Sequence, residues 1–386
     1  MDSAENLIAA LSFRRPARIP MIDMGYWSET LERWRAEGLP AAVLEVPDQS
    51  PSGADIRTFW GADYVERSRM LRVADHFGLE YWPGHSRLPI SESLYPSFRA
   101  EVLEDLGDTV IYRDGQGIVV KKPKTATAFP AFLDFPVKTL ADYEALLPRM
   151  QPDDPGRYAP GWELWAAHLR SQGRPVCIFV RGFFGFPRNL MGFERLCTAY
   201  YDEPKLIERI VQDRCEFIKR LFSPVLERIH IHCALIWEDM AYNHGSMISP
   251  RTFRRFMLPY YQEINDFFHS KGVDRTLVDS DGNIVELCAL FAEGRVDGVY
   301  PLEIAAGSDP LVLRERYPDL ALIGGVDKRA LAQGPDAIDR ELERLAPLVE
   351  SGGFVPMVDH YLPPDISFAD YLHYRRRMAE LCNFER

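Results

Sequence analysis

Carboxylates follow the apolar stretches in the second half of the chain, at the points where predicted β-strands end. The stretch 276–283, TLVDSDGN, runs from apolar residues into Asp279 and Asp281, and then into Gly282 and Asn283 before a helical pattern begins. This composition is typical of a turn that leads from a buried strand into a helix. The other polar residues at predicted strand ends are Arg181, Glu238, Asp239, Glu303, Asp327, Asp359 and His360.

The ends of parallel strands meet at one edge of a sheet, where α/β proteins bind their ligands. Carboxylates gathered there raise each other's pKa unless a cation lies among them. The pattern therefore predicts a metal ion, a cationic substrate, or a carboxyl group that stays protonated and acts as a general acid. A plainer interpretation is that Asp281 or Asn283 only caps the following helix and that Asp279 only braces the loop.

The elements that carry these residues alternate regularly from about residue 175 onward. Strands that are apolar throughout and alternate with helices indicate a parallel sheet covered on both faces. We predict a (β/α)8 barrel in which one or two strands are hidden in the N-terminal half. A doubly wound sheet is the alternative, but the chain has no GxGxxG or P-loop pattern. The strand patterns lie at 176–182, 233–238, 276–281, 297–303, 320–327 and 354–359.

The N-terminal part, residues 1–155, is less regular than the βα units of 175–383. Its apolar run at 19–25 is a candidate first strand. The clearest hairpin of the chain is 108–123, where β-branched runs flank a DGQG turn. We expect the whole chain, 1–386, to fold as a single barrel domain with irregular loops in its N-terminal part.

Composition and charge restrict the class of partner. The formal net charge of −12 argues against nucleic acid or an anionic membrane surface as the main partner. No apolar run approaches the roughly 20 residues that span a bilayer, and the first residues do not form a secretory signal. The scattered cysteines, without a CxxC pair, are typical of a cytoplasmic protein. The HIHC motif at 230–233 precedes a predicted strand, at the opposite end from the carboxylates, and we interpret it as structural.

Several long motifs occur in an order that resembles the uroporphyrinogen decarboxylase superfamily over about residues 175–380. This superfamily includes the decarboxylase proper and zinc-dependent methyltransferases that move methyl groups to and from corrinoids or onto thiols. The resemblance implies a (β/α)8 barrel whose site lies at the carboxyl ends of the strands. The motifs are IWEDMAYNHGSMISPRTFRRFMLPYYQEI, VDSDGNI, PLEIAAGSDP, LIGGVDKRAL and GGFVPMVDHYLPPDIS.

The chain also departs from the superfamily's patterns. The decarboxylase proper has an arginine-rich motif of the form MRQAGR, and this chain has IPMIDMGYWSETLERWR in its place, so decarboxylation of uroporphyrinogen is not expected. The thiol-activating methyltransferases bind zinc through an HxC pair and a later cysteine. The matching positions here are Asp279, Asp281 and Asp359 or His360. The resemblance therefore makes these four residues candidate ligands of a divalent metal, with zinc as the expected ion, although an oxygen-rich set also suits harder cations.

The resemblance implies a methyltransferase that takes a methyl group from a methoxylated or methylated small molecule. A corrinoid on a separate protein would accept it, because this chain has no DxHxxG corrinoid-binding signature. The alternatives are a decarboxylase or lyase acting on a small carboxylated substrate, and a non-catalytic binding barrel. Cleaving a methyl ether needs acid or metal assistance, which the acidic residues would supply. We predict catalytic roles for Glu238, Asp279, Asp281 and His360, and substrate contacts for Arg181, Tyr242, Asn283 and Glu303.

Overall fold

The centre of the molecule is a parallel sheet whose strands run in the order β12-β11-β10-β9-β6-β5. The computed structural model describes residues 1–46, 50, 52–60, 62–124 and 130–383. The sheet confirms all the strands predicted in the second half of the chain, although β10 is shorter than its pattern. The strands are β5 (Cys177–Arg181), β6 (Cys233–Trp237), β9 (Arg275–Asp279), β10 (Gly298–Tyr300), β11 (Ala321–Val326) and β12 (Phe354–Val358).

Two segments of the N-terminal half close this sheet into a (β/α)8 barrel. Residues 86–88 run beside β5: the Cys177 N–H donates to Ser86 O at 3.1 Å, and the Leu88 N–H donates to Cys177 O at 2.8 Å. After β12, Tyr26 forms a parallel bridge with Leu362. The stretches of chain that lead into these two segments are joined where the Glu80 N–H donates to Met21 O at 3.0 Å. The predicted barrel is therefore confirmed.

The predicted strand at 19–25 is wrong as a regular strand, because the structure gives this run no strand hydrogen-bonding pattern. It still occupies a position in the barrel wall, with Ile19 and Ile22 buried in the core. Its contacts are single bridges and side-chain bonds rather than a continuous ladder. An apolar run predicts burial here, but not the backbone geometry.

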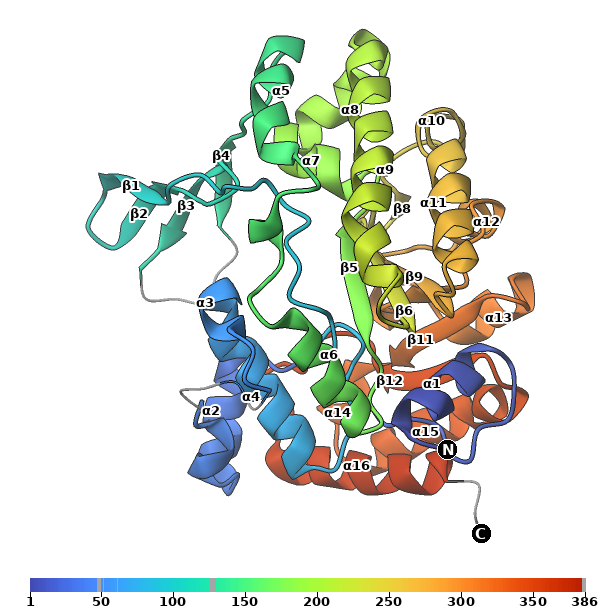
Figure 1. The fold of residues 1–386 in the computed structure, drawn as a ribbon. Helices are drawn as coiled ribbons and strands as arrows, with labels where there is room; N and C mark the ends of the chain where they lie inside the picture. The colour runs from blue at the N-terminus through green and yellow to red at the C-terminus, as the bar shows by residue number, and fades with distance from the viewer. Residues whose placement is uncertain (47–49, 51, 61, 125–129, 384–386) are drawn as a thin grey trace.

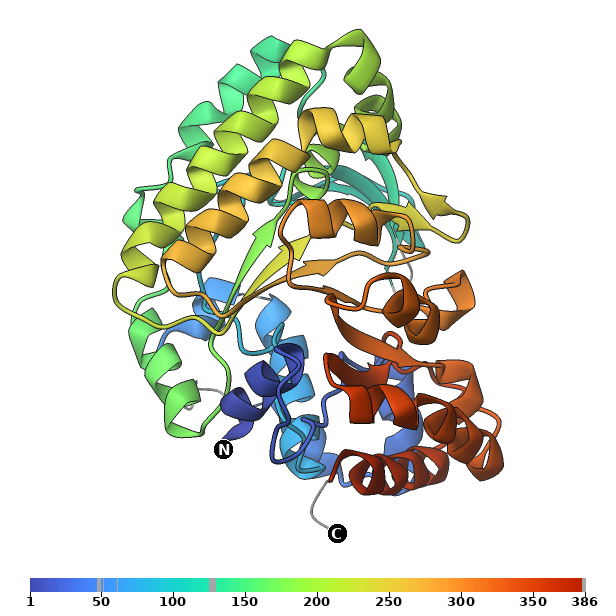
Figure 2. The same ribbon diagram turned by 90° about the vertical axis from the view of Figure 1, so that its right-hand side faces the viewer.

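Helices pack around the outside of the barrel, and Figure 2 shows them surrounding the strands. In the first half these are α1 (Ser3–Leu11), α2 (Ser28–Glu37), α3 (Ile56–Trp60), α4 (Ala62–His76), α5 (Leu140–Leu146), α6 (Trp162–Ser171) and α7 (Gly185–Met191). They are followed by α8 (Phe193–Asp202), α9 (Pro204–Leu226), α10 (Pro250–Phe256), α11 (Leu258–Ser270), α12 (Leu287–Glu293), α13 (Pro310–Arg316), α14 (Lys328–Leu331), α15 (Pro335–Ser351) and α16 (Phe368–Cys382). Among the described residues, no helix has the length and apolar character needed to cross a membrane.

A separate antiparallel sheet stands at the side of the barrel, near α5 (Figure 1). Its middle strands, β2 and β3, confirm the predicted hairpin, with Thr109 opposite Pro123 and Arg113 opposite Val119. The strands are β1 (Glu101–Asp105), β2 (Thr109–Arg113), β3 (Val119–Pro123) and β4 (Ala131–Asp134), in that order across the sheet.

Candidate active site

Asp279 is the last residue of β9, and its side chain lines a cavity of about 300 Å³ in the mouth of the barrel. The strand reaches this point because Leu277 and Val278 are fully buried between the two layers of the barrel. Tyr300 at the end of β10 and Tyr361 after β12 line the same cavity. Strand ends that are distant in sequence thus meet where the parallel topology predicts.

Burial raises the pKa of Asp279 well above its ordinary value, and the charges of Asp281 and Asp239 raise it further. A side-chain hydrogen bond with Tyr300 offsets only part of this shift. Asp279 is therefore a carboxylic acid that holds its proton at pH values where an exposed aspartate has lost it. It has the chemistry of a general acid.

Asp281 lies next to His360, with Asp281 Oδ1 3.5 Å from His360 Nε2. Burial favours neutral forms of both groups, but their hydrogen bond and mutual attraction outweigh it. The pKa of Asp281 is therefore lowered and that of His360 is raised. The turn between Asp279 and the next helix requires a glycine at position 282. Gly282 has φ +86°, and a Cβ at this position would lie 2.8 Å from the backbone of Ala241 and Tyr242.

Asp239 belongs to the same group, although the sequence analysis assigned it no role beyond its position at a predicted strand end. Its Oδ1 accepts a hydrogen bond from the Asp281 N–H at 3.4 Å, and its Oδ2 lies 3.1 Å from Nη2 of Arg188. Burial, followed by the charge of Asp281, raises the pKa of Asp239. The backbone of Asp239 has φ +54°, an uncommon conformation for a residue with a side chain.

Lys328 supplies a positive charge to the neighbouring acids. Its Nζ lies 3.6 Å from Glu303 Oε1 and 3.7 Å from Asp359 Oδ1. The two Asp359 oxygens accept hydrogen bonds from the N–H groups of Ile304 (3.1 Å) and Lys328 (3.3 Å). Burial raises the pKa of Asp359 to about 6. The bonds of Asp359 make it a brace between the loops after β10 and β11.

Glu238 is fully buried and has a similar bracing position after β6. Its carboxylate accepts hydrogen bonds from the N–H groups of Phe183 (2.8 Å), Phe184 (2.8 Å) and Gly185 (2.7 Å), and from the hydroxyl of Tyr261. Burial raises its pKa, and these bonds oppose the rise. A catalytic role for Glu238 stays a prediction, but its contacts hold the loop that follows β5.

The predicted substrate contacts are mostly occupied by partners within the protein. The Arg181 guanidinium bonds to the carboxylate of Glu92, which it shares with Arg214, and lies 2.6 Å from Ser93 Oγ. Asn283 Oδ1 accepts a hydrogen bond from the Val285 N–H at 3.2 Å, which is a turn-forming contact. Tyr242 is 63% exposed. Glu303 Oε2 accepts a hydrogen bond from the Gly282 N–H at 2.9 Å and so braces the turn after Asp281.

Two arginines that the sequence did not indicate, Arg67 and Arg87, line the cavity with Asp279. Arg67 lies on α4, and Arg87 lies in the segment that runs beside β5. The irregular N-terminal pattern gave no signal that either residue faces the barrel mouth.

Comparison with known proteins identifies the family. A family model described as uroporphyrinogen decarboxylase (URO-D) matches residues 101–373. The chain belongs to the uroporphyrinogen decarboxylase family. Membership of this family indicates an enzyme, and it agrees with the superfamily resemblance of the sequence motifs.

Relatives within this family are distant in sequence. The chain is 25% identical over 255 residues to a uroporphyrinogen decarboxylase of Rhodococcus erythropolis, covering 60% of this chain and 65% of that protein. It is 26% identical over 232 residues to one of a Geobacter species, covering 54% of this chain and 60% of that protein. A solved methyltransferase from Methanosarcina mazei has the same fold, with a TM-score of 0.62 and 16% identity over 98% of this chain and 99% of that one.

The zinc site that the superfamily resemblance predicts fits these residues poorly. Asp359 already accepts two backbone hydrogen bonds and faces Lys328, and Asp279 is hydrogen-bonded to Tyr300. Only Asp281 and His360 are placed together. No third histidine, cysteine or acidic donor among the described residues lies within 4.8 Å of both ligand atoms. We therefore derive no reaction step through a metal.

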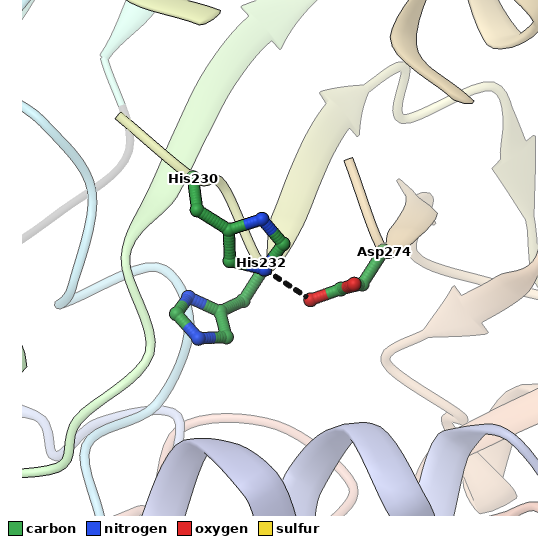
Figure 3. A group of neighbouring side chains, drawn as sticks. All are labelled: His230, His232 and Asp274. Atoms are coloured by element: carbon green, nitrogen blue, oxygen red, sulfur yellow. Dashed lines mark hydrogen bonds and ion pairs between the residues drawn. The ribbon is translucent and has the colours of Figure 1, made fainter. Parts of the chain in front are cut away.

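Within the described chain, the one group of donors with metal-like spacing is His230, His232 and Asp274 (Figure 3). It lies before β6 and β9, at the opposite end of the barrel from Asp279, as the sequence predicts for HIHC. His230 Nε2 lies 2.8 Å from Asp274 Oδ2. His232 Nδ1 accepts a hydrogen bond from the Val176 N–H at 3.0 Å, so its other ring nitrogen carries the proton in the neutral form. His232 therefore offers no free lone pair, and the group is structural.

Proposed function

We propose that this protein transfers a methyl group from a methoxylated or methylated small molecule, with Asp279 as the general acid. The observation that carries the proposal is the position of Asp279, which lines a cavity of about 300 Å³ in the barrel mouth, where burial and neighbouring carboxylates raise its pKa. This volume lies at the small end of the range of ligand pockets. It suits a substrate built on a single substituted ring.

The chemistry of demethylation explains why such an acid is useful. When the bond between methyl carbon and oxygen breaks, the oxygen leaves with the bonding electron pair and needs a proton. Asp279 donates that proton as negative charge develops on the oxygen, and a positioned acid contributes about 10²–10⁴-fold in rate. The resulting carboxylate lies among Asp281 and Asp239, which makes its return to the protonated form favourable.

The acceptor in this proposal is a reduced corrinoid on a separate protein, which supplies the nucleophile for the methyl group. The likeness of the fold to a methyltransferase from Methanosarcina mazei supports a barrel suited to such chemistry. Placement in the cytoplasm stays a prediction of the sequence.

Decarboxylation of a small carboxylated substrate is the second candidate. The observation that favours it is the family itself, together with the uroporphyrinogen decarboxylases among the relatives. A protonated Asp279 would then deliver its proton to a carbanion after loss of carbon dioxide. The residues are shared by both reactions, so the product must decide between them.

The test uses purified protein with methoxylated aromatic compounds and cob(I)alamin. We expect methylcobalamin and the demethylated phenol to form together, and we expect Asp279→Asn to lower the rate by about 10²-fold or more. The matched control is Asp274→Asn, which changes an aspartate at the opposite end of the barrel and should leave the rate unchanged. Release of carbon dioxide without methylcobalamin would favour the decarboxylase instead, and turnover that survives Asp279→Asn would contradict the role of the acid.

A further inference from the structure

Two guanidinium groups face the Asp279 cavity without an acidic partner. In the part of the chain that the structure describes, no carboxylate oxygen lies within 4.0 Å of the guanidinium of Arg67 or Arg87. Among the described residues, Arg67 donates side-chain hydrogen bonds only to the carbonyl oxygen of Gly84, at 3.3 and 3.4 Å, and it packs over the ring of Trp60 at 4.6 Å. Arg87 packs over the ring of Phe179 at 4.8 Å.

This arrangement is costly for the folded protein on its own. Burial lowers the pKa of both arginines. The charge of Arg87 lowers the pKa of Arg67 further, and the charge of Arg181 lowers the pKa of Arg87 further. A desolvated charge without a partner destabilises a protein, and such charges persist mainly at functional sites. A bound anion would remove this cost.

His85 adds a second unsatisfied group to the same cavity wall. Its side chain is more than nine-tenths buried, and its Nδ1 has no hydrogen-bond partner in the part of the chain that the structure describes. Burial, followed by the charges of Arg67 and Arg87, lowers the pKa of His85 to about 3, so the ring is neutral. A neutral ring leaves the two arginines as the charges that define this wall.

The acids around the cavity do not cancel the arginines. Asp63 and Glu66 line it from α4; Asp63 attracts both arginines and Glu66 attracts Arg67, but both carboxylates are exposed and neither forms an ion pair with these arginines. Burial, followed by the charges of Asp281 and Asp239, raises the pKa of Asp279 and so favours its neutral form. The wall formed by Arg67 and Arg87 is therefore the positive end of the cavity, and Asp279 is the proton-donating end.

We propose that Arg67 and Arg87 bind a carboxylate of the substrate and so direct its methoxyl or methyl group toward Asp279. The substrate class is then a small methoxylated or methylated carboxylic acid, and this assignment of class rests on the proposed methyl transfer. A planar guanidinium forms paired hydrogen bonds with a carboxylate, which fixes orientation as well as position.

The cavity has a route by which such an acid can enter. A larger groove of about 1310 Å³ shares Asp63, Arg87 and Phe179 with the cavity and extends to the β2–β3 turn. Arg87 lies at the junction of the two spaces. A carboxylate that enters from the groove meets Arg87 before it reaches Asp279.

The test is a calorimetric titration of the whole protein with 4-methoxybenzoate and with the neutral 4-methoxybenzamide, which has nearly the same shape. We expect the acid to bind at least about tenfold more tightly, and Arg87→Gln or Arg67→Gln to weaken acid binding by about tenfold or more, as expected for a charged hydrogen bond. The control is Arg220→Gln, an exposed arginine paired with Asp153, which should bind the acid like the wild type. Inorganic phosphate serves as a competitor. If phosphate displaces 4-methoxybenzoate only at much higher concentration, the site prefers a carboxylate. If phosphate displaces it at equal concentration, the choice of a carboxylate as the anion is overturned.

Thermal unfolding separates this role from a structural one. Without ligand, the Arg→Gln variants should unfold at the wild-type temperature or above it, and the acid should stabilise only the wild type and the control. Equal binding of acid and amide, or variants that bind the acid like the wild type, would overturn the site. Loss of stability in the unliganded variants would mean that Asp63 or Glu66 pairs with the arginines, which would overturn the site.

The two proposals can fail separately. Tight acid binding without methyl transfer would count against the proposed function alone. Methyl transfer without preference for acids would count against this inference alone.

Discussion

His360 Nε2 lies 3.5 Å from Asp281 Oδ1, and each group shifts the pKa of the other toward the charged form despite their partial burial. The pair has no net charge: it sets one negative charge, on Asp281, against one positive charge, on His360. Arg188 and Lys328 supply positive charges next to Asp239 and Asp359. The acidic strand ends are therefore stabilised by protons and by basic side chains of the protein itself.

The ion pair predicts how His360 titrates. In an NMR titration, we expect a His360 pKa above the ordinary value of 6.5, because Asp281 favours the protonated ring more than burial disfavours it. In Asp281→Asn the attraction is gone and burial remains, so the pKa should fall below 6.5. A His360 pKa that is unchanged by this substitution would mean that the two side chains do not interact.

The same pair predicts a pH dependence of stability. The raised pKa of His360 contributes stability that is present below 6.5 and is lost as the pH rises through the folded value, whereas the lowered pKa of Asp281 contributes stability above 3.8 that is lost in acid. Asp281→Asn should therefore lower the free energy of unfolding most between these values, by about 1 kcal/mol or less because the pair is partly solvated. Urea unfolding at several pH values measures this difference.

The proton on Asp279 predicts an activity that falls with rising pH. Burial, and then the charges of Asp281 and Asp239, raise the pKa of Asp279, so the rate of demethylation should fall only as the pH passes that raised value. Asp281→Asn removes one of the raising charges and should move the fall to lower pH. A fall at the same pH in both proteins would assign the titration to another group.

The bracing contacts of Glu238 predict a large effect on stability. Glu238→Ala leaves three backbone N–H groups and the Tyr261 hydroxyl without their acceptor. Each unsatisfied buried group costs about 1–3 kcal/mol, so the free energy of unfolding should fall by about 3 kcal/mol or more. Glu238→Gln keeps one acceptor oxygen and should cost less. An alanine variant within about 1 kcal/mol of the wild type would show that the loop after β5 does not depend on this carboxylate.

The contacts of Asp359 and Asp279 predict that the purified protein holds zinc well below one ion per chain. Their oxygens are bonded to backbone N–H groups and to Tyr300, and Asp281 and His360 alone make an incomplete tetrahedral site. Elemental analysis measures the content. Nearly one zinc per chain that disappears in Asp281→Ala would instead support the ligand set expected from the sequence resemblance.

Much of the fold could be predicted because its signals are local. Buried runs such as 320–327 give strands, and the DGQG turn gives the hairpin 108–123. The parallel topology then brings Asp279, Asp281 and His360 together without further information. The run 249–272 has a helical pattern throughout, but the structure divides it into α10 and α11 at Met257, and Pro259 in the first turn of α11 is the local signal of this division.

The rest depends on partners that lie far away in the sequence. Glu238 braces a loop more than 50 residues earlier, which no pattern around it indicates. Arg87 reaches the cavity because residues 86–88 pair with Cys177, although their own pattern does not predict a strand. Arg67 lies on a helix whose sequence does not mark the face that meets the barrel. Charged residues placed by such contacts become visible only in three dimensions.

We expect Asp279 to keep its proton at neutral pH, and infrared difference spectroscopy tests this expectation without any substrate. The spectrum of the wild type minus that of Asp279→Asn should contain the carbonyl stretch of a protonated carboxylic acid at neutral pH. The same difference for Asp274→Asn should contain only carboxylate bands, because Asp274 is bonded to His230 near the surface. A carboxylate signal alone for Asp279 would contradict its role as the general acid.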